Sequence, residues 1–136
     1  MAEVHVDKST GAVEVKRVVC VQDMGHVINP EGAKLQIEGC ITMSMGYTLS
    51  EDIQFEGGKI YTRNFDTHEL PKYSWLLKIE SFFIEAKNDP PQGGGEPAII
   101  CKGAVVANAI FNGSGARLLQ LPMTPKRVYE ALELLP

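Results

Sequence analysis

Alternating apolar and polar positions predict two strands at the start of the chain. Glu3–Val6 alternates charged and apolar residues as a half-buried strand does, and Asp7–Gly11 is typical of a hairpin turn. Val13–Val21 is the predicted returning strand, and it ends in an apolar run that begins at Val18. A strand that becomes continuously apolar is expected to enter the interior of the protein.

One long helix is predicted from Glu31 to about Leu49. Asn29 is a fair N-cap for this helix, and Pro30 is a fair first residue. Three glycines recur at a spacing of seven and therefore share one stripe of the helix: Gly32, Gly39 and Gly46. An interior glycine costs about 1 kcal/mol relative to alanine. Two explanations are open, a tightly packed helix crossing or the close approach of a ligand.

The middle of the chain predicts a hairpin, an irregular excursion and a further strand. Ser50–Phe55 and Lys59–Arg63 flank Glu56-Gly57-Gly58, which is a compact hairpin signal. Asn64–Tyr73 shows no regular period. Leu77–Ala86 alternates as a strand does, and its direction leads the chain into a run of three glycines.

An almost uncharged run, Ala98–Phe111, predicts a buried helix whose only charge is Lys102. Asn112–Gly115 ends this helix and offers a glycine for a left-handed C-cap. A short strand and a last helix follow: Arg117–Leu121 and Thr124 to about Leu134. The order of elements predicts one domain over residues 1–136, of the α+β class, with a mixed sheet layered with helices.

Composition narrows the classes of protein that this chain can represent. Hydrophobic residues make up 44% and charged residues 22%, which is ordinary for a soluble globular chain. The net charge of −4, with no basic cluster longer than Lys126-Arg127, argues against nucleic acid as a partner. Neither an apolar run of about 18 residues nor a signal-peptide pattern is present, so we expect a soluble protein, cytoplasmic or periplasmic.

The three cysteines are odd in number, far apart in the sequence and flanked by apolar residues: Cys20, Cys40 and Cys101. This pattern predicts buried free thiols rather than a disulfide framework. The three histidines are scattered as well, so no metal-ligating set is predicted.

The segment Pro90–Ala98 places three glycines before Glu96 and Pro97. Glycines let a backbone come close to a ligand, and Pro97 is expected to hold Glu96 in the extended region at the start of a helix. Smaller polar residues cap helices better than Glu, so a longer carboxylate here suggests a role other than capping. A solvated loop with an incidental Glu is the alternative. A nucleotide-binding module is disfavoured, because the glycine spacing differs from both phosphate-binding patterns and Glu96 would repel phosphate.

Four motifs, in order, resemble the last segment of the molybdenum-binding large subunit of the xanthine dehydrogenase/aldehyde oxidase family. They are Asp23-x-Gly25-x-x-x-Asn29-Pro30, Gln36-Ile37-Glu38-Gly39 with Met45-Gly46, Gly93-Gly94-Gly95-Glu96-Pro97, and Ala107–Phe111 followed by Leu121–Pro125. The chain is most similar to the isoquinoline 1-oxidoreductase beta-subunit-like and membrane-bound aldehyde dehydrogenase branches. Gly94 departs mildly from the family, which usually has a small aliphatic residue or Ser there.

The resemblance implies a molybdenum–molybdopterin cofactor in the full-length subunit and an aldehyde or N-heterocycle as substrate. Glu96 would be the catalytic base, taking a proton from the water-derived oxygen that is transferred. Gln36, Gly94 and Gly95 would bind the cofactor, and no residue of this chain would ligate the metal. The implied partners are the rest of the molybdenum subunit and an iron–sulfur subunit or domain.

The relatives are several times longer, so the resemblance also implies that this chain is a C-terminal fragment of a larger subunit. On its own it is then expected to bind no cofactor, to be inactive and to self-associate, because the helix Ala98–Phe111 and the glycine stripe would normally face the missing part. The alternative is a non-catalytic structural or interaction domain that has kept the fold.

Overall fold

The computed structural model describes residues 1–84 and 86–136. Its centre is a three-stranded sheet of β1 (Ala2–Val6), β2 (Val13–Gln22) and β5 (Lys78–Phe83), in the order β1-β2-β5. β1 runs antiparallel and β5 parallel to the central strand β2, so the sheet is mixed, as the order of elements predicted. The predicted strand Leu77–Ala86 is shorter than expected, and its residue Glu85 lies outside the described residues.

A β-bulge decides which residues of β2 face the core. The register of the β1–β2 pairing shifts and leaves Lys16 as an extra residue. Val15 faces inward before the bulge, and Val18 faces inward after it. The prediction that the whole apolar run enters the interior is wrong, because only alternate side chains point inward: Val18 is 2% exposed, whereas Val21 is 61% exposed.

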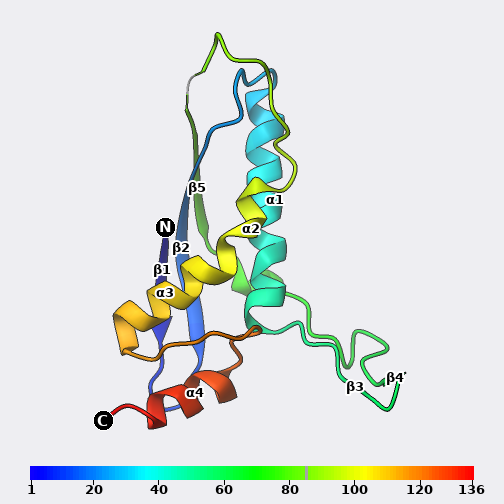
Figure 1. Cartoon of the computed structure of the whole chain (residues 1–136), viewed down its shortest axis with the longest axis vertical. Coiled ribbons are helices and arrows are strands. Elements are labelled where there is room, and N and C mark those ends of the chain that lie inside the picture. The colour runs from blue at the N-terminus through cyan, green and yellow to red at the C-terminus, as the bar shows by residue number, and fades with distance from the viewer. Residues whose placement is uncertain (85) are drawn as a thin grey trace.

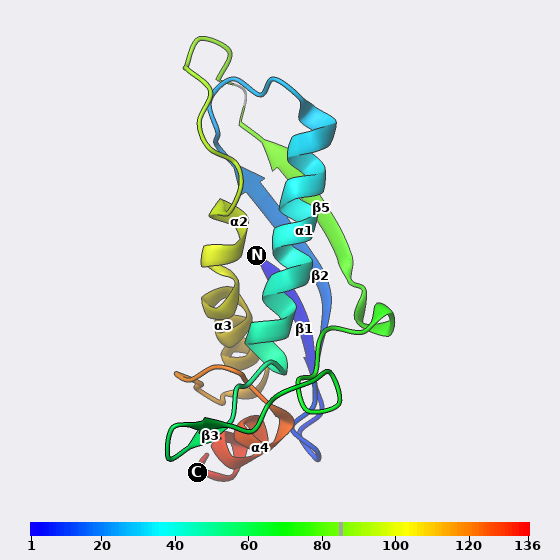
Figure 2. The ribbon, with the colours of Figure 1, turned by 90° about the vertical axis from the view of Figure 1, so that its right-hand side faces the viewer.

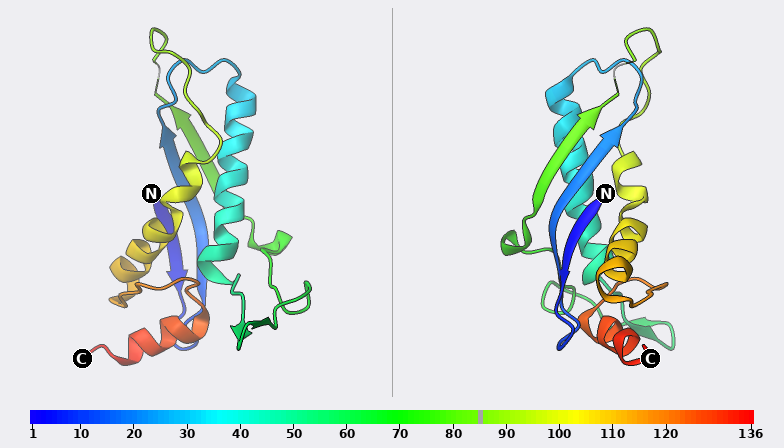
Figure 3. Two further views of the ribbon diagram at one scale, coloured as in Figure 1. Left: turned by 45° about the vertical axis from the view of Figure 1, so that its right-hand side comes forward. Right: turned by 90° about the vertical axis from the view of Figure 1, so that its left-hand side faces the viewer.

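Three helices cover one face of the sheet and leave the other face open (Figures 1 and 3). They are α1 (Pro30–Leu49), α2 (Pro97–Ile100) and α3 (Lys102–Ser114). The core lies between the two layers, and its fully buried large side chains include Val18, Ile37, Ile41, Val106, Ile110, Met123 and Val128. None of the described helices is long and apolar enough to cross a membrane.

The predicted single helix over Ala98–Phe111 is in fact two helices that break at Cys101. In a continuous helix the carbonyl of Ile99 would pair with the backbone N–H four residues later. Here it accepts hydrogen bonds from the Tyr47 hydroxyl and from the N–H of Cys101. Only one side of the two helices is buried, so Ile100 is 79% exposed although its neighbour Lys102 is 3% exposed.

The predicted strand Arg117–Leu121 is absent, because this segment crosses the ends of helices and has no described strand beside it to pair with. It follows Gly115, the left-handed C-cap of α3 (φ +86°). A glycine C-cap within Asn112–Gly115 was predicted from sequence. The segment leads to α4 (Pro125–Glu133), where the Thr124 hydroxyl caps the helix by accepting from the Arg127 N–H. The N–H of Met123 donates to the carbonyl of Thr48 at 2.7 Å and ties the segment to the end of α1.

The predicted hairpin forms an arm that projects away from the body of the protein (Figures 1 and 2). Its strands are only two residues long each, β3 (Phe55–Glu56) and β4 (Lys59–Ile60), and a 3₁₀ helix, η1 (Tyr73–Trp75), follows before β5.

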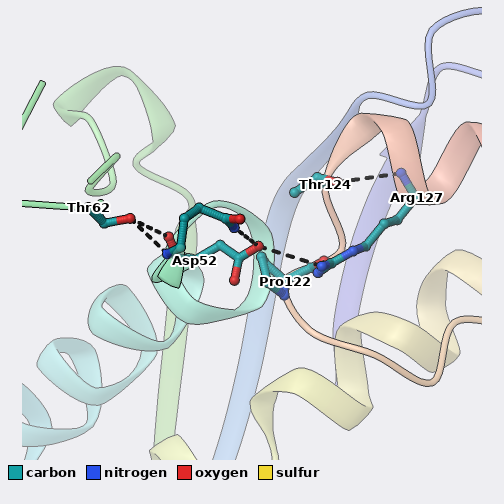
Figure 4. A network of polar contacts seen from close by, with 6 residues as sticks. Asp52, Thr62, Pro122, Thr124 and Arg127 are labelled. Carbon is teal, nitrogen blue, oxygen red and sulfur yellow. Dashed lines mark hydrogen bonds and ion pairs between the residues drawn. The ribbon is translucent and has the colours of Figure 1, made fainter. Parts of the chain in front are cut away.

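A polar network fixes the base of this arm to the C-terminal segment (Figure 4). The Asp52 carboxylate accepts from Gln54 Nε2 at 2.8 Å and lies 3.5 Å from the Arg127 guanidinium. The same guanidinium donates to the carbonyl of Pro122 at 2.8 Å. One carboxylate therefore joins the arm to the segment that leads into α4.

The three stripe glycines of α1 have three different surroundings. A Cβ on Gly32 would lie 3.0 Å from the Asn29 side chain, and a Cβ on Gly46 would meet the Glu51 carboxylate. A Cβ on Gly39 would meet no described atom within 4 Å. No second helix of the described chain packs along the whole stripe, so a helix crossing does not explain it.

Two glycine-to-alanine changes should have opposite effects on the free energy of unfolding. Gly39→Ala adds a methyl group in open space on a helix and should raise the free energy of unfolding by about 0.5–1 kcal/mol. Gly25→Ala should lower it by at least about 1–2 kcal/mol, because Gly25 has φ +67° and its Cβ would meet the Pro90 carbonyl. Urea unfolding of both variants is the measurement. A neutral Gly25→Ala would contradict the described conformation of that loop.

Candidate functional site

Three side chains on one stripe of α1 hold the segment that carries Glu96. Gln36 Nε2 and Cys40 Sγ each donate to the carbonyl of Gly95, both at 2.9 Å. The Tyr47 hydroxyl donates to the carbonyl of Ile99 at 2.5 Å. Residues four and eleven positions apart lie within roughly 40° of one another around a helix, so these side chains can reach one partner segment. We call Gln36, Cys40 and Tyr47 the α1 latch.

The three loop glycines differ in what a side chain at each would meet. A Cβ on Gly93 or Gly95 would have no described atom within 4 Å. A Cβ on Gly94 would instead collide with the terminal methyl group of Met24, which is buried beneath the loop. The loop is therefore packed from below at Gly94 and open at Gly93 and Gly95. The predicted cofactor contact of Gly95 has room to form, and that of Gly94 stays a prediction.

The motif that begins at Asp23 forms the base of the loop. The carbonyl of Met24 accepts from the N–H of Gln92 at 2.9 Å, and the N–H of His26 donates to the carbonyl of Asp89 at 3.2 Å. Gly25 lies between these two bonds, and only a residue without a side chain leaves room there for Pro90. Two motifs that are far apart in the sequence thus form one structural unit.

Glu96 is the N-cap residue of α2, and its side chain is exposed and makes no capping hydrogen bond. Its backbone has φ −124° and ψ −6°, so the prediction of an extended residue is wrong. The carbonyl of Glu96 turns to accept from the N–H of Ile99 at 2.9 Å, which requires ψ near zero. The helix that it caps has only four residues rather than a long buried helix, and the carboxylate is left available to a ligand.

Exposed apolar side chains lie on α1, which carries Gln36, and on α2, which follows Glu96. Leu35 and Met43, on α1, are each 67% exposed, and Ile100, on α2, is 79% exposed. Gly39 lies between the two α1 residues and adds no side chain. The site therefore combines one carboxylate, one amide and open backbone within an exposed apolar rim, which is the composition of a surface that normally meets a ligand or another part of a protein.

Sequence reasoning missed two buried polar groups on the neighbouring strands β2 and β5. Gln22 is only 6% exposed, and neither atom of its amide has a hydrogen-bond partner among the described residues. Its Nε2 lies 3.7 Å from the position of a Cβ on Gly94. The Ser81 hydroxyl, on the neighbouring strand, is likewise buried without a partner in the described part of the chain. A polar residue at the end of the apolar run in β2 was the available signal for Gln22.

The thiols are free, but they are not uniformly buried as predicted. Cys40 is buried, Cys20 is half-buried, and Cys101 is exposed because it lies at the break between α2 and α3. Burial raises the pKa of the Cys20 thiol, although the nearby Lys102 charge acts in the opposite direction. Within residues 1–84 and 86–136, no group of three His, Cys, Asp or Glu side chains is placed to hold a metal ion.

A profile of the molybdopterin cofactor-binding domain matches residues 1–75, and the chain belongs to this family. One of the subunits of nicotinate dehydrogenase from Pseudomonas putida is 36% identical over 132 residues, which cover 97% of this chain and 11% of that protein. The family resemblance identified from the sequence motifs is thereby confirmed.

Solved structures agree with this assignment and with the predicted fold. Quinoline 2-oxidoreductase of Pseudomonas putida superposes with a TM-score of 0.88 at 28% identity, over 98% of this chain and 18% of that one. Aldehyde oxidoreductase of Desulfovibrio desulfuricans superposes with a TM-score of 0.84 at 30% identity, over 96% of this chain and 15% of that one. The chain thus spans less than a fifth of the length of each of these proteins.

Lys102 should make the stability of the protein depend on pH. Burial disfavours its charged form and lowers its pKa from 10.5 to about 8. Between these two values the unfolded chain holds a proton that the folded chain has lost, so the free energy of unfolding rises with pH through this window. Below about pH 8 the folded chain bears the full cost of burying the charged amino group. A pKa difference of this size corresponds to about 3 kcal/mol.

Lys102→Met should therefore raise the free energy of unfolding at pH 7 by up to about 3 kcal/mol, and the gain should shrink between pH 8 and 10.5. Denaturant unfolding at several pH values measures this. The control is Lys59→Met, on the exposed arm. A gain that does not depend on pH would show that packing, not charge burial, is responsible.

Proposed function

We propose that the chain is the C-terminal segment of the molybdenum-binding subunit of an oxidoreductase that oxidises an aldehyde or an N-heterocycle. The observation that carries this proposal is the contact between Gln36 and the loop that ends in Glu96. The Gln36 amide bonds the carbonyl of Gly95 at 2.9 Å, so the two predicted site residues converge on the open side of the glycine loop. The two substrate classes come from the names of the relatives. Nicotinate and quinoline are N-heterocycles, and the third name gives an aldehyde.

The residues present fit a pterin cofactor at this surface. Gln36 is exposed and uses one N–H on Gly95, so its second N–H and its amide oxygen are available to a ligand. Gly93 and Gly95 leave open space above the loop, where a flat ring system could approach the backbone. When bound, the molybdenum cofactor would supply the two-electron oxidation of the substrate. Gln36, Gly94 and Gly95 would hold it through hydrogen bonds and close backbone contact.

Glu96 gives this site a carboxylate that can take up a proton. Its carboxylate makes no capping bond and lies at the mouth of the loop, next to Gly95. A carboxylate within hydrogen-bond reach of the reacting oxygen acts as a general base. The apolar rim formed by Leu35, Met43 and Ile100 would exclude water once it is covered, which strengthens the interactions of that carboxylate.

The proposal assigns the remaining parts of the reaction to protein outside this chain. The rest of the molybdenum subunit and an iron–sulfur subunit or domain are the proposed partners, and the 136-residue chain alone is expected to be inactive. The rival function is a non-catalytic structural or interaction domain. It would account for the fold and the apolar surface, but it gives no role to a carboxylate that is exposed at the end of a glycine loop.

Glu96→Gln in the full-length subunit separates the two functions. The change keeps the size and shape of the side chain but removes the base, so folding and molybdenum content should stay close to wild type. Turnover should fall by roughly 10²–10⁴. Steady-state kinetics beside metal analysis are the measurements, with Glu56→Gln on the exposed arm as the control. Wild-type turnover at full metal content would remove Glu96 from the mechanism.

Gln36→Ala should weaken retention of the cofactor in the same subunit while leaving the fold intact. Losing the contact of one amide should cost about 1–3 kcal/mol of binding, because the partner groups are left unsatisfied. The molybdenum content after extended dialysis measures retention, and Gln120→Ala, an exposed residue elsewhere, is the matched control. If the variant retains molybdenum as wild type does, Gln36 is a packing residue only.

A further inference from the structure

The carbonyl of Gly95 receives two hydrogen bonds from α1, and Gln36 is only one of the donors. The second donor is the thiol of Cys40, whose Sγ lies 2.9 Å from the same oxygen. A carbonyl oxygen has two lone pairs, so both bonds can exist together. The bonded oxygen belongs to the peptide group that links Gly95 to Glu96. Its orientation therefore sets where the backbone of Glu96 begins.

The two donors differ in how firmly they can hold this peptide group. Gln36 is exposed and reaches the carbonyl through a long side chain with several rotatable bonds. Cys40 is 5% exposed and has a short side chain on the middle of a 20-residue helix. Within the described residues its thiol makes this one hydrogen bond. The buried thiol is therefore the more firmly held of the two donors while Gln36 also binds a ligand.

We propose that Cys40 is a positioning residue: its thiol holds the Gly95–Glu96 peptide group so that the carboxylate of Glu96 stays in register with the loop while Gln36 binds a ligand. This inference rests on the proposed function of Glu96 and Gln36, and it goes beyond it by giving the buried thiol a role in the site. Cys40 itself contacts neither substrate nor cofactor.

Three changes in the full-length subunit test the role of the thiol in turnover. Cys40→Ala removes the donor, and kcat should fall by about 2- to 10-fold, the range for one lost hydrogen bond, while KM and molybdenum content stay unchanged. Cys40→Ser supplies a hydroxyl donor to the same carbonyl and should restore most of kcat. Cys20→Ala is the matched control, because it removes a half-buried thiol that packs against the same core.

Infrared spectroscopy tests the hydrogen bond itself, without turnover. The S–H stretching band lies apart from other protein absorption, and hydrogen bonding moves it to lower frequency. The band that disappears in Cys40→Ala should lie at lower frequency than the band that disappears in Cys20→Ala. Equal frequencies would show that the Cys40 thiol does not hold the Gly95 carbonyl and would overturn the proposal.

The kinetic outcomes are equally decisive. Wild-type kcat in Cys40→Ala would overturn the proposal, and so would a loss that Cys40→Ser fails to restore or that follows loss of molybdenum. Failure of the proposed function is seen separately, in Glu96→Gln. Wild-type turnover in that variant would show that Glu96 is not the base. The infrared comparison would still decide whether the thiol holds the loop.

Discussion

The site depends on hydrogen bonds from one stripe of α1 to backbone carbonyls of the segment that follows the glycine loop. Three consecutive glycines have little conformational preference of their own, so a loop built from them needs external contacts to hold one shape. The α1 latch supplies those contacts through two donors on Gly95 and one on Ile99. The bond to Ile99 also coincides with the break between α2 and α3, which leaves Glu96 at the start of a four-residue helix.

The interior carries polar groups that a small protein core normally avoids. Gln22 and Ser81 are buried without hydrogen-bond partners among the described residues, and burial lowers the pKa of Lys102 with no carboxylate there to offset it. Each such group lowers stability, because it has given up water without a full replacement. Gln22 and Ser81 lie on neighbouring strands, and Lys102 lies at the start of α3. Of the three, Gln22 is the one shown against the loop, because its Nε2 lies 3.7 Å from the position of a Cβ on Gly94. The unpaired Gln22 amide is thus next to the candidate site, where function often overrides optimal packing.

One face of the sheet and one side of α1 are uncovered, and the arm projects from the body (Figures 1 and 3). The arm also exposes apolar side chains. Phe55 and Phe65, on the arm, are 73% and 81% exposed, which is unusual for side chains of this size. Helices of a lone globular domain usually have one apolar side, whereas α1 has apolar residues on both its buried and its exposed side. These surfaces agree with the short coverage of the much longer relatives, in which this segment is a small part of one chain.

The sequence by itself determined the elements whose signals are local. The first hairpin, the cap and first residue of α1, the left-handed Gly115 and the Thr124 cap all follow from side-chain chemistry within a few residues. The family motifs predicted a site of Gln36, Gly94, Gly95 and Glu96, and their roles stay a prediction. The structure bonds the Gln36 amide to the Gly95 carbonyl beside Glu96. Tertiary structure decided what depends on partners from distant segments. The Tyr47 hydroxyl bonds the Ile99 carbonyl beside the break between α2 and α3, a bulge in β2 sends Val21 outward, and Met24 fills the space below Gly94. No local pattern encodes these contacts, because each joins segments that approach one another only once the chain has folded.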